Sequence, residues 1–155
     1  MKKIPYTREG LSRLYSEYEL LEKKRKPALE DLKSAREKGD LSENSAYRAA
    51  RFKLSSIDNR LRSVKSLIDK AYIIENKNIE FVDIGTYVTI TDDKNISQTF
   101  RIVNTFESDI SKGQISYYSP LGKELMGKKI NDKVSVTTPS GIKNYLIKSI
   151  SLEIK

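Results

Sequence analysis

A chain of 155 residues, 37 % of them hydrophobic, has room for one ordinary domain or two small ones with a modest core. Cys and His are both absent, which excludes disulfides, zinc–thiolate sites, the usual hydrolytic triads and most imidazole acid–base chemistry. No apolar run is long enough to cross a membrane, and Met1–Pro5 leads into charged residues without an apolar signal segment. We therefore expect a cytoplasmic protein with no membrane segment.

The positive charge of the chain lies almost entirely in its first half. The formal net charge is +8, from 29 Lys and Arg against 21 Asp and Glu. Residues 1–77 hold 19 basic and 12 acidic side chains, whereas the remainder holds 10 and 9. A basic half beside a nearly neutral half favours a polyanion, most often nucleic acid, as the partner of the first half. A solvated, Lys-rich helical surface accounts for the same charge equally well.

Two stretches of the first half show the 3-4 spacing of a heptad seam. The first runs from Leu11 to Ala35 with one polar entry, Arg25, and the second runs from Tyr47 to Ala71 with none. Two such seams separated by about ten residues predict an antiparallel helical hairpin. At 1.5 Å per residue the hairpin is a rod on the order of 45 Å long, too thin for an interior pocket.

Residues 39–44, here called the tip segment, separate the two predicted helices. Gly39 suits the left-handed residue that closes the first helix, and Asp40 and Glu43 have the capping-box spacing for the second. Both carboxylates therefore have a purely structural explanation. They are also hard oxygen ligands of the kind that magnesium prefers. Because magnesium takes about six oxygen ligands, two side chains form only half of a site, and a partner, phosphates and water must supply the rest.

Basic residues surround the tip segment. Arg36 precedes it, and Arg48, Arg51 and Lys53 follow it. Arg48 and Arg51 are three residues apart, which places them on one helix face. Guanidinium groups at this spacing predict binding to a phosphate backbone. Weak surface salt bridges are the alternative, and for Lys53 we favour that alternative.

Beyond about residue 80 the apolar period changes to that of β-strands. Five short segments rich in β-branched and aromatic residues predict an antiparallel sheet: residues 87–91, 100–103, 114–118, 134–137 and 145–150. One short helix is expected over 120–127. The polar stretch 75–80 has the composition of a linker, so we divide the chain into domains 1–76 and 80–155.

A corner of the second half combines a rigid turn with an apolar side chain. Ser119, Pro120 and Leu121 follow the third predicted strand directly. An exposed corner of this kind predicts a docking patch. The start of a helix is the alternative, because Pro is ordinary in the first helical turn.

Residues 35–51, Ala-Arg-Glu-Lys-Gly-Asp-Leu-Ser-Glu-Asn-Ser-Ala-Tyr-Arg-Ala-Ala-Arg, closely resemble the coiled-coil tip of the bacterial transcript-cleavage elongation factors, the Gre family. Residues 4–10 are similar to the start of the family's sequences, and residues 119–129 and 136–141 resemble its carboxy-terminal signatures. The matches span nearly the whole chain in the family's order. The context of the tip segment is closer to the A type of the family than to the B type.

The resemblance implies an α+β protein with an amino-terminal antiparallel coiled coil and a small FKBP-like antiparallel-sheet domain. It implies a monomeric, DNA-binding transcription factor that docks on bacterial RNA polymerase and inserts its coiled coil into the secondary channel. In the family the polymerase remains the nuclease, and the factor stimulates cleavage of the 3′ end of a backtracked transcript. We therefore expect an accessory factor, not an enzyme.

The resemblance also assigns roles to individual residues. Asp40 and Glu43 match the acids that help to retain a magnesium ion and an attacking water at the polymerase's active centre, so no tightly bound cofactor is expected in the isolated chain. Asn44 has a supporting role in the same motif. Arg36 and Arg51 match basic positions associated with the 3′ segment of the nascent RNA, and we add Arg48 from its local charge. Ser119, Pro120 and Leu121 match the polymerase-docking signature.

Two alternatives belong to other functional classes. A Gre-like inhibitor would occupy the same channel and block synthesis, although the paired acids Asp40 and Glu43 count against it. A helical hairpin that binds nucleic acid or a client by itself would show salt-sensitive binding to naked RNA.

Overall fold

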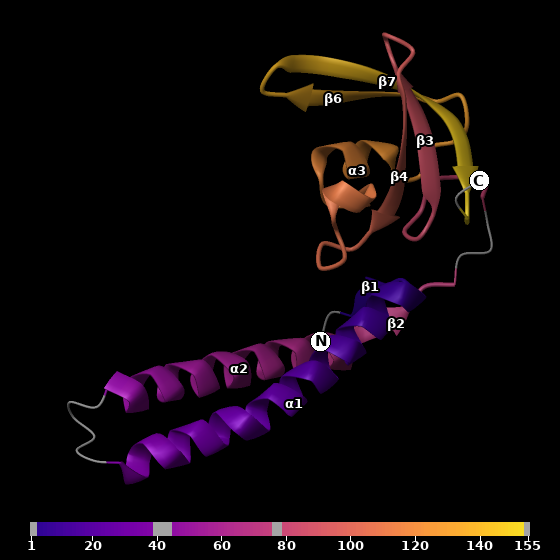
Figure 1. The fold of residues 1–155 in the computed structure, drawn as a ribbon. Helices are drawn as coiled ribbons and strands as arrows, with labels where there is room; N and C mark the ends of the chain where they lie inside the picture. The colour runs from indigo at the N-terminus through magenta and orange to yellow at the C-terminus, as the bar shows by residue number, and fades with distance from the viewer. Residues whose placement is uncertain (1–2, 39–44, 76–78, 154–155) are drawn as a thin grey trace. The chain divides into compact units, whose positions relative to one another are not determined.

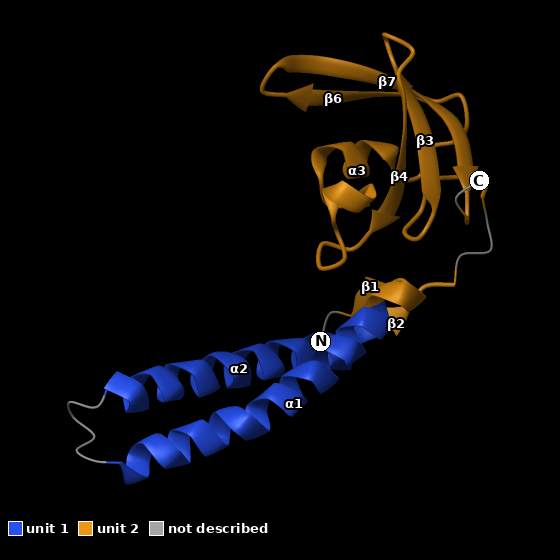
Figure 2. Ribbon diagram, in the orientation of Figure 1, with its two compact units in different colours: residues 1–2, 11–71 blue, residues 3–10, 72–155 orange. Residues whose placement is uncertain are grey.

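The computed structural model describes residues 3–38, 45–75 and 79–153, and it divides into two compact units (Figures 1 and 2). Unit 1 comprises residues 1–2 and 11–71, and unit 2 comprises residues 3–10 and 72–155. The tip segment and half of the predicted linker, residues 76–78 of 75–80, lie outside the described residues.

Unit 1 contains the predicted helical hairpin. Helix α1 spans Arg8–Glu37 and continues through Pro27, and helix α2 spans Ser45–Lys70. Three ion pairs join the helices: Glu17 with Arg60, Arg25 with Asp58, and Asp31 with Lys53. Because the partner's number falls as the α1 number rises, the two helices run antiparallel, as predicted.

The two heptad seams form the interface between the helices. The most deeply buried seam residues are Ala28 and Val64, which are fully buried, and Leu14, Ala35 and Ala50 are at least nine-tenths buried. The remaining apolar seam positions are half-buried. The polar entry of the first seam, Arg25, stays exposed. The periodicity of the sequence therefore predicted the packed face of each helix correctly.

Unit 2 is built on a five-stranded sheet with one short helix (Figure 1). In chain order its elements are β3 (Tyr87–Asp92), β4 (Ser97–Val103), the 3₁₀ turn η1 (Ile110–Lys112), β5 (Gln114–Ser116), α3 (Pro120–Leu125), β6 (Lys133–Thr138) and β7 (Gly141–Ser151). The strand order is β5-β4-β3-β7-β6. All five predicted strands and the predicted helix are present, so the fold class is confirmed.

One pair of strands differs from the prediction of an antiparallel sheet. β5 pairs with β4 in parallel, with Arg101 opposite Gln114, whereas the other pairs are antiparallel. The reason is the connection after β4, in which η1 and the left-handed Gly113 (φ 67°) carry the chain back before β5 begins. The sheet is therefore mixed.

The core of unit 2 lies between the sheet and α3. Its buried members come from the strands, from the segment before β3 and from α3: Val82, Val88, Ile90, Ile102, Ile115, Leu125, Val134, Ile147 and Ile150. These residues are mostly β-branched, which suits packing on a pleated surface. Leu125 is the contribution of α3 and is completely buried.

The amino-terminal segment 3–10 belongs to unit 2 by its contacts. It contains β1 (Ile4–Tyr6), which pairs with β2 (Ala71–Ile73) in a separate two-stranded sheet. Two side chains of unit 2 bind the segment: Asn104 donates to the carbonyl of Pro5 at 2.6 Å, and Glu107 accepts from the backbone N–H of Thr7 at 3.1 Å. The division predicted from the sequence instead groups residues 3–10 with the hairpin, in domain 1–76. The hydrogen bonds of this segment join residues about 100 positions apart, which leave no local pattern in the sequence.

Candidate functional site

The predicted acids Asp40 and Glu43 and the supporting Asn44 lie outside the described residues. The site is therefore described through the helical turns that flank the tip segment. Arg36 lies in the last turn of α1, and Arg48 and Arg51 lie in the first two turns of α2. The structure brings these three arginines to the same end of the hairpin, and all three are exposed.

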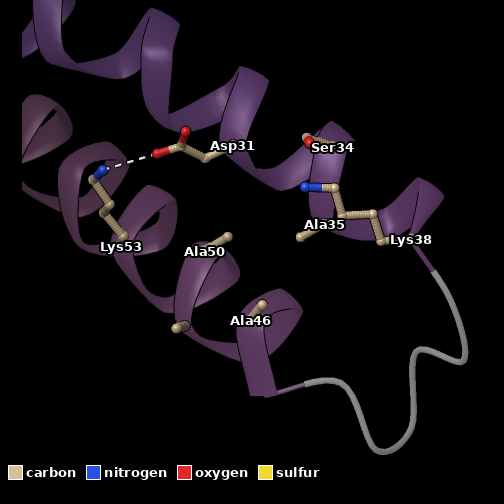
Figure 3. Close-up of a pocket in the computed structure, with 8 residues that line it drawn as sticks. Asp31, Ser34, Ala35, Lys38, Ala46, Ala50 and Lys53 are labelled. Carbon is tan, nitrogen blue, oxygen red and sulfur yellow. Dashed lines mark hydrogen bonds and ion pairs between the residues drawn. The ribbon is translucent and has the colours of Figure 1, made fainter.

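A shallow groove of about 420 Å³ lies between the last turns of α1 and the first turns of α2 (Figure 3). It is lined by Asp31, Ser34, Ala35, Lys38, Ala46, Ala49, Ala50 and Lys53. Four of these are alanines, and their small side chains leave the groove open between the two backbones. The ammonium group of Lys38 and the ion pair between Lys53 and Asp31, at 3.0 Å, give it polar edges.

Lys53 follows the alternative favoured from the sequence, that of a surface ion pair. Its partner is Asp31 on the facing helix, because the antiparallel register places the two side chains opposite each other. More than half of each side chain is exposed, so the pair adds little to stability. Lys53 is therefore less suited to bind phosphate than a basic side chain without such an ion pair.

Arg48 and Arg51 differ from the arginines in the body of the hairpin. Arg25 and Arg60 each bind a carboxylate at 2.6 Å, and the hydrogen bonds that they donate to Asp58 and Glu17 raise the pKa values of these two guanidinium groups. In the part of the chain that the structure describes, Arg48 and Arg51 make no ion pair. Their donors are available to an external anion such as phosphate.

The structure adds one residue that the sequence reasoning missed at this end of the hairpin. Phe52 lies between Arg51 and Lys53, and 78 % of its side chain is exposed. The signal in the sequence was its position: Phe52 falls between the seam residues Ala50 and Leu54, on the outward side of the predicted helix.

The predicted docking corner is the start of α3. Ser119 caps the helix by accepting from the N–H of Gly122 at 3.0 Å, and its hydroxyl donates to the carbonyl of Ser116 at 2.6 Å. Pro120 occupies the first helical turn and is exposed, whereas Leu121 is half-buried against the core. The interpretation of this sequence as the start of a helix is therefore confirmed, whereas the docking patch stays a prediction.

A close approach of two backbones holds this corner in shape. A Cβ atom on Gly122 would lie 2.1 Å from the carbonyl oxygen of Ser116, so only glycine fits at this position. Tyr118, next to the corner, is half exposed, and its ring lies 4.2 Å from that of Tyr117. The corner is therefore rigid on its inner side and aromatic on its outer side.

Within residues 3–38, 45–75 and 79–153, no group of three or more acidic side chains could hold a metal ion. No helix in those ranges is long and apolar enough to span a membrane.

Comparison with known proteins identifies both halves of the chain. Residues 4–73 match the family described as "Transcription elongation factor, N-terminal", and residues 76–152 match "Transcription elongation factor, GreA/GreB, C-term". GreA of Novosphingobium aromaticivorans is 35 % identical over 97 % of this chain and 96 % of its own length. GreA of Rickettsia prowazekii is 39 % identical over 96 % and 94 %, and GreA of Thermotoga petrophila is 39 % identical over 97 % and 98 %.

Among solved structures, the GreA factor homolog 1 (Gfh1) of Thermus thermophilus aligns with a TM-score of 0.47 at 25 % identity, over 96 % of this chain and 99 % of that one. On the sequence matches alone, the chain belongs to the GreA/GreB family of transcription elongation factors. Within the family it is of the A type, as the tip context predicted, and its function is that of a Gre-type elongation factor.

Proposed function

We propose that this elongation factor binds bacterial RNA polymerase, inserts the end of its hairpin into the secondary channel and stimulates the polymerase's own cleavage of backtracked RNA. The observation that carries the proposal is the end of the hairpin itself. Exposed arginines that make no ion pair among the described residues lie on both helices and flank, in the sequence, a segment that holds Asp40 and Glu43. A thin basic rod with a carboxylate pair at its end suits a site completed by another molecule.

The paired acids are the chemical contribution that we assign to the chain. Two carboxylates are too few for magnesium, and the described residues offer no acidic cluster that could complete the set. Asp40 and Glu43 would therefore act as ligands to an ion held mainly by the polymerase and would orient the attacking water. A magnesium ion so held supplies charge neutralisation at the scissile phosphate and a more acidic water. The factor is an accessory protein in this scheme, and the polymerase is the nuclease.

The basic residues would hold the substrate in place. Arg36, Arg48 and Arg51 would contact phosphates of the nascent RNA 3′ segment, and Asn44 would support the acids. Polymerase docking is assigned to Ser119, Pro120 and Leu121 in unit 2. Support for that assignment comes from the exposed ring of Pro120 on a corner that Ser119 and Gly122 make rigid.

The test is transcript cleavage by a backtracked elongation complex with the double variant Asp40→Ala, Glu43→Ala. We expect loss of stimulated cleavage with little change in binding to the polymerase, because the acids act only at the reacting phosphate. The matched control is Glu19→Ala, Glu22→Ala, which removes two exposed acids at the same spacing from the body of α1.

Two results would contradict the proposal. Full cleavage by the double variant would show that the acids are dispensable, and RNA digestion by the isolated chain would show that it is itself a nuclease. Slowed run-off synthesis without any stimulated cleavage would instead identify a channel-blocking inhibitor.

A further inference from the structure

Phe52 has the most exposed aromatic side chain among the described residues, with 78 % of its surface accessible. It lies seven residues from the start of α2, about 10 Å along the helix from the tip segment at 1.5 Å per residue. The ring makes no ring–ring or cation–π contact within the described part of the chain. Most of the ring is therefore accessible to a ligand.

Arg48 and Arg51 share the helix surface with this ring. At 3.6 residues per turn, Arg48, Arg51 and Phe52 fall within an arc of about 100° on the side of α2 away from the seam. Ser55 lies in the same arc one turn further on and is also exposed. Between residues 48 and 59 the arc thus contains one aromatic ring, two guanidinium groups and otherwise small polar side chains.

We propose that Phe52 is a stacking platform for an unpaired base of the nascent RNA 3′ segment, with Arg48 and Arg51 on the adjoining phosphates. The inference rests on the proposed function, because it places single-stranded RNA beside the hairpin. An aromatic face next to cationic groups is the arrangement with which proteins bind single strands irrespective of sequence.

Charge and composition favour RNA over a protein surface as the occupant. A protein interface has an apolar centre built from several side chains, whereas Phe52 is the only large apolar residue in its arc. The two neighbouring arginines have no internal carboxylate partner among the described residues, so they complement a polyanion. A single ring between cations gives stacking area without a hydrophobic patch.

The experiment measures the affinity of labelled factor for backtracked complexes whose RNA carries an abasic nucleotide at successive positions of the 3′ segment. With intact RNA we expect Phe52→Ala and Phe52→Leu to raise the half-saturating concentration about tenfold, and Phe52→Tyr to retain affinity. When the abasic nucleotide stands at one particular position, the half-saturating concentration of the wild type should rise by the same factor. That of Phe52→Ala should not rise further at this position. Leu20→Ala, at a half-exposed residue in the body of α1, is the control and should change nothing.

The outcomes separate this inference from the proposed function, because binding is measured without cleavage. Unchanged affinity of Phe52→Ala overturns the inference. The inference is also overturned if Phe52→Ala binds more weakly than the wild type by the same factor at every abasic position. The ring would then contact the polymerase and not a base. Failure of the proposed function would appear instead as cleavage that survives removal of Asp40 and Glu43.

Discussion

The carboxylate of Glu107 accepts a hydrogen bond from the backbone N–H of Thr7 at 3.1 Å, and the hydroxyl of Thr7 donates to the same carboxylate. Thr7 in turn accepts from the N–H of Gly10 at 3.0 Å, as an N-cap residue does at the start of a helix. Asn104 donates a further bond to Glu107 at 2.7 Å. Glu107 is only 6 % exposed, so these donors are what make a buried carboxylate tolerable in unit 2.

The first prediction concerns Gly10, which the carboxylate of Glu107 covers. In an exposed helix Gly→Ala stabilises by about 1 kcal/mol. Here the new Cβ atom would lie 1.8 Å from Oε2 of Glu107, so the carboxylate must move and give up its bonds. We expect Gly10→Ala to lower the free energy of unfolding by about 1–2 kcal/mol in urea titrations.

The control is the same substitution in a Glu107→Ala background, where the obstruction is gone. Gly10→Ala should there be neutral or stabilising, although Glu107→Ala alone destabilises. Additive effects of the two substitutions would show that the carboxylate does not hold the amino-terminal segment.

The second prediction concerns Tyr6 in strongly alkaline solution. Burial, and after it the negative charge of Glu107, raises the pKa of Tyr6 from its ordinary 10.0 to about 12. The unfolded chain loses the phenolic proton near the ordinary pKa, whereas the folded chain keeps it until the raised one. The stability tied to Tyr6 is therefore complete below about pH 10 and is lost as the pH rises towards about 12.

Tyr6→Phe removes this titration. Its free energy of unfolding, measured in urea across that pH range, should fall less steeply than that of the wild type. At neutral pH the substitution should change stability little, because the hydroxyl has no hydrogen-bond partner among the described residues. Parallel pH profiles for the two proteins would contradict the assignment.

The third prediction concerns the salt dependence of binding to a backtracked complex. If Arg48 and Arg51 each neutralise an RNA phosphate, the variant Arg48→Ala, Arg51→Ala should bind more weakly. The slope of log affinity against log salt should become shallower by about 1.4, two contacts at about 0.7 each for a single strand. Fluorescence titration at several salt concentrations measures both quantities.

Lys53→Ala is the matched control for this experiment. Lys53 lies on the same helix but is neutralised by Asp31 at 3.0 Å, so its removal should leave the salt slope unchanged. A slope that responds equally to all three basic residues would indicate general attraction to the rod and no defined phosphate contact.

The helical hairpin was predictable because its cause is local. Apolar residues repeat at helical spacing along both seams, and each helix must bury that stripe whatever the rest of the chain does. Alternation and β-branched composition likewise marked the five strands of unit 2. The strands β1 and β2 were missed, because each is three residues long and borders a long helix whose period dominates the local pattern.

The residues of the candidate site were predictable from the sequence, but the ion pairs that they form were not. The sequence placed Arg48, Arg51 and Lys53 near the tip segment. Only the register of the two helices decided that Lys53 meets Asp31, while the two arginines find no carboxylate partner in the described part of the chain. The exposure of Phe52, by contrast, follows from the helical period, because it falls between the seam residues Ala50 and Leu54.

The sequence by itself therefore determined the two helices, the strands, the family and the residues offered for chemistry, since repeats and motifs are read from neighbours in the chain. Tertiary structure alone decided that β5 runs parallel to β4, that Glu107 binds Thr7 and which cations are neutralised. Each of these depends on a contact between residues far apart in the chain, for which no period or spacing exists.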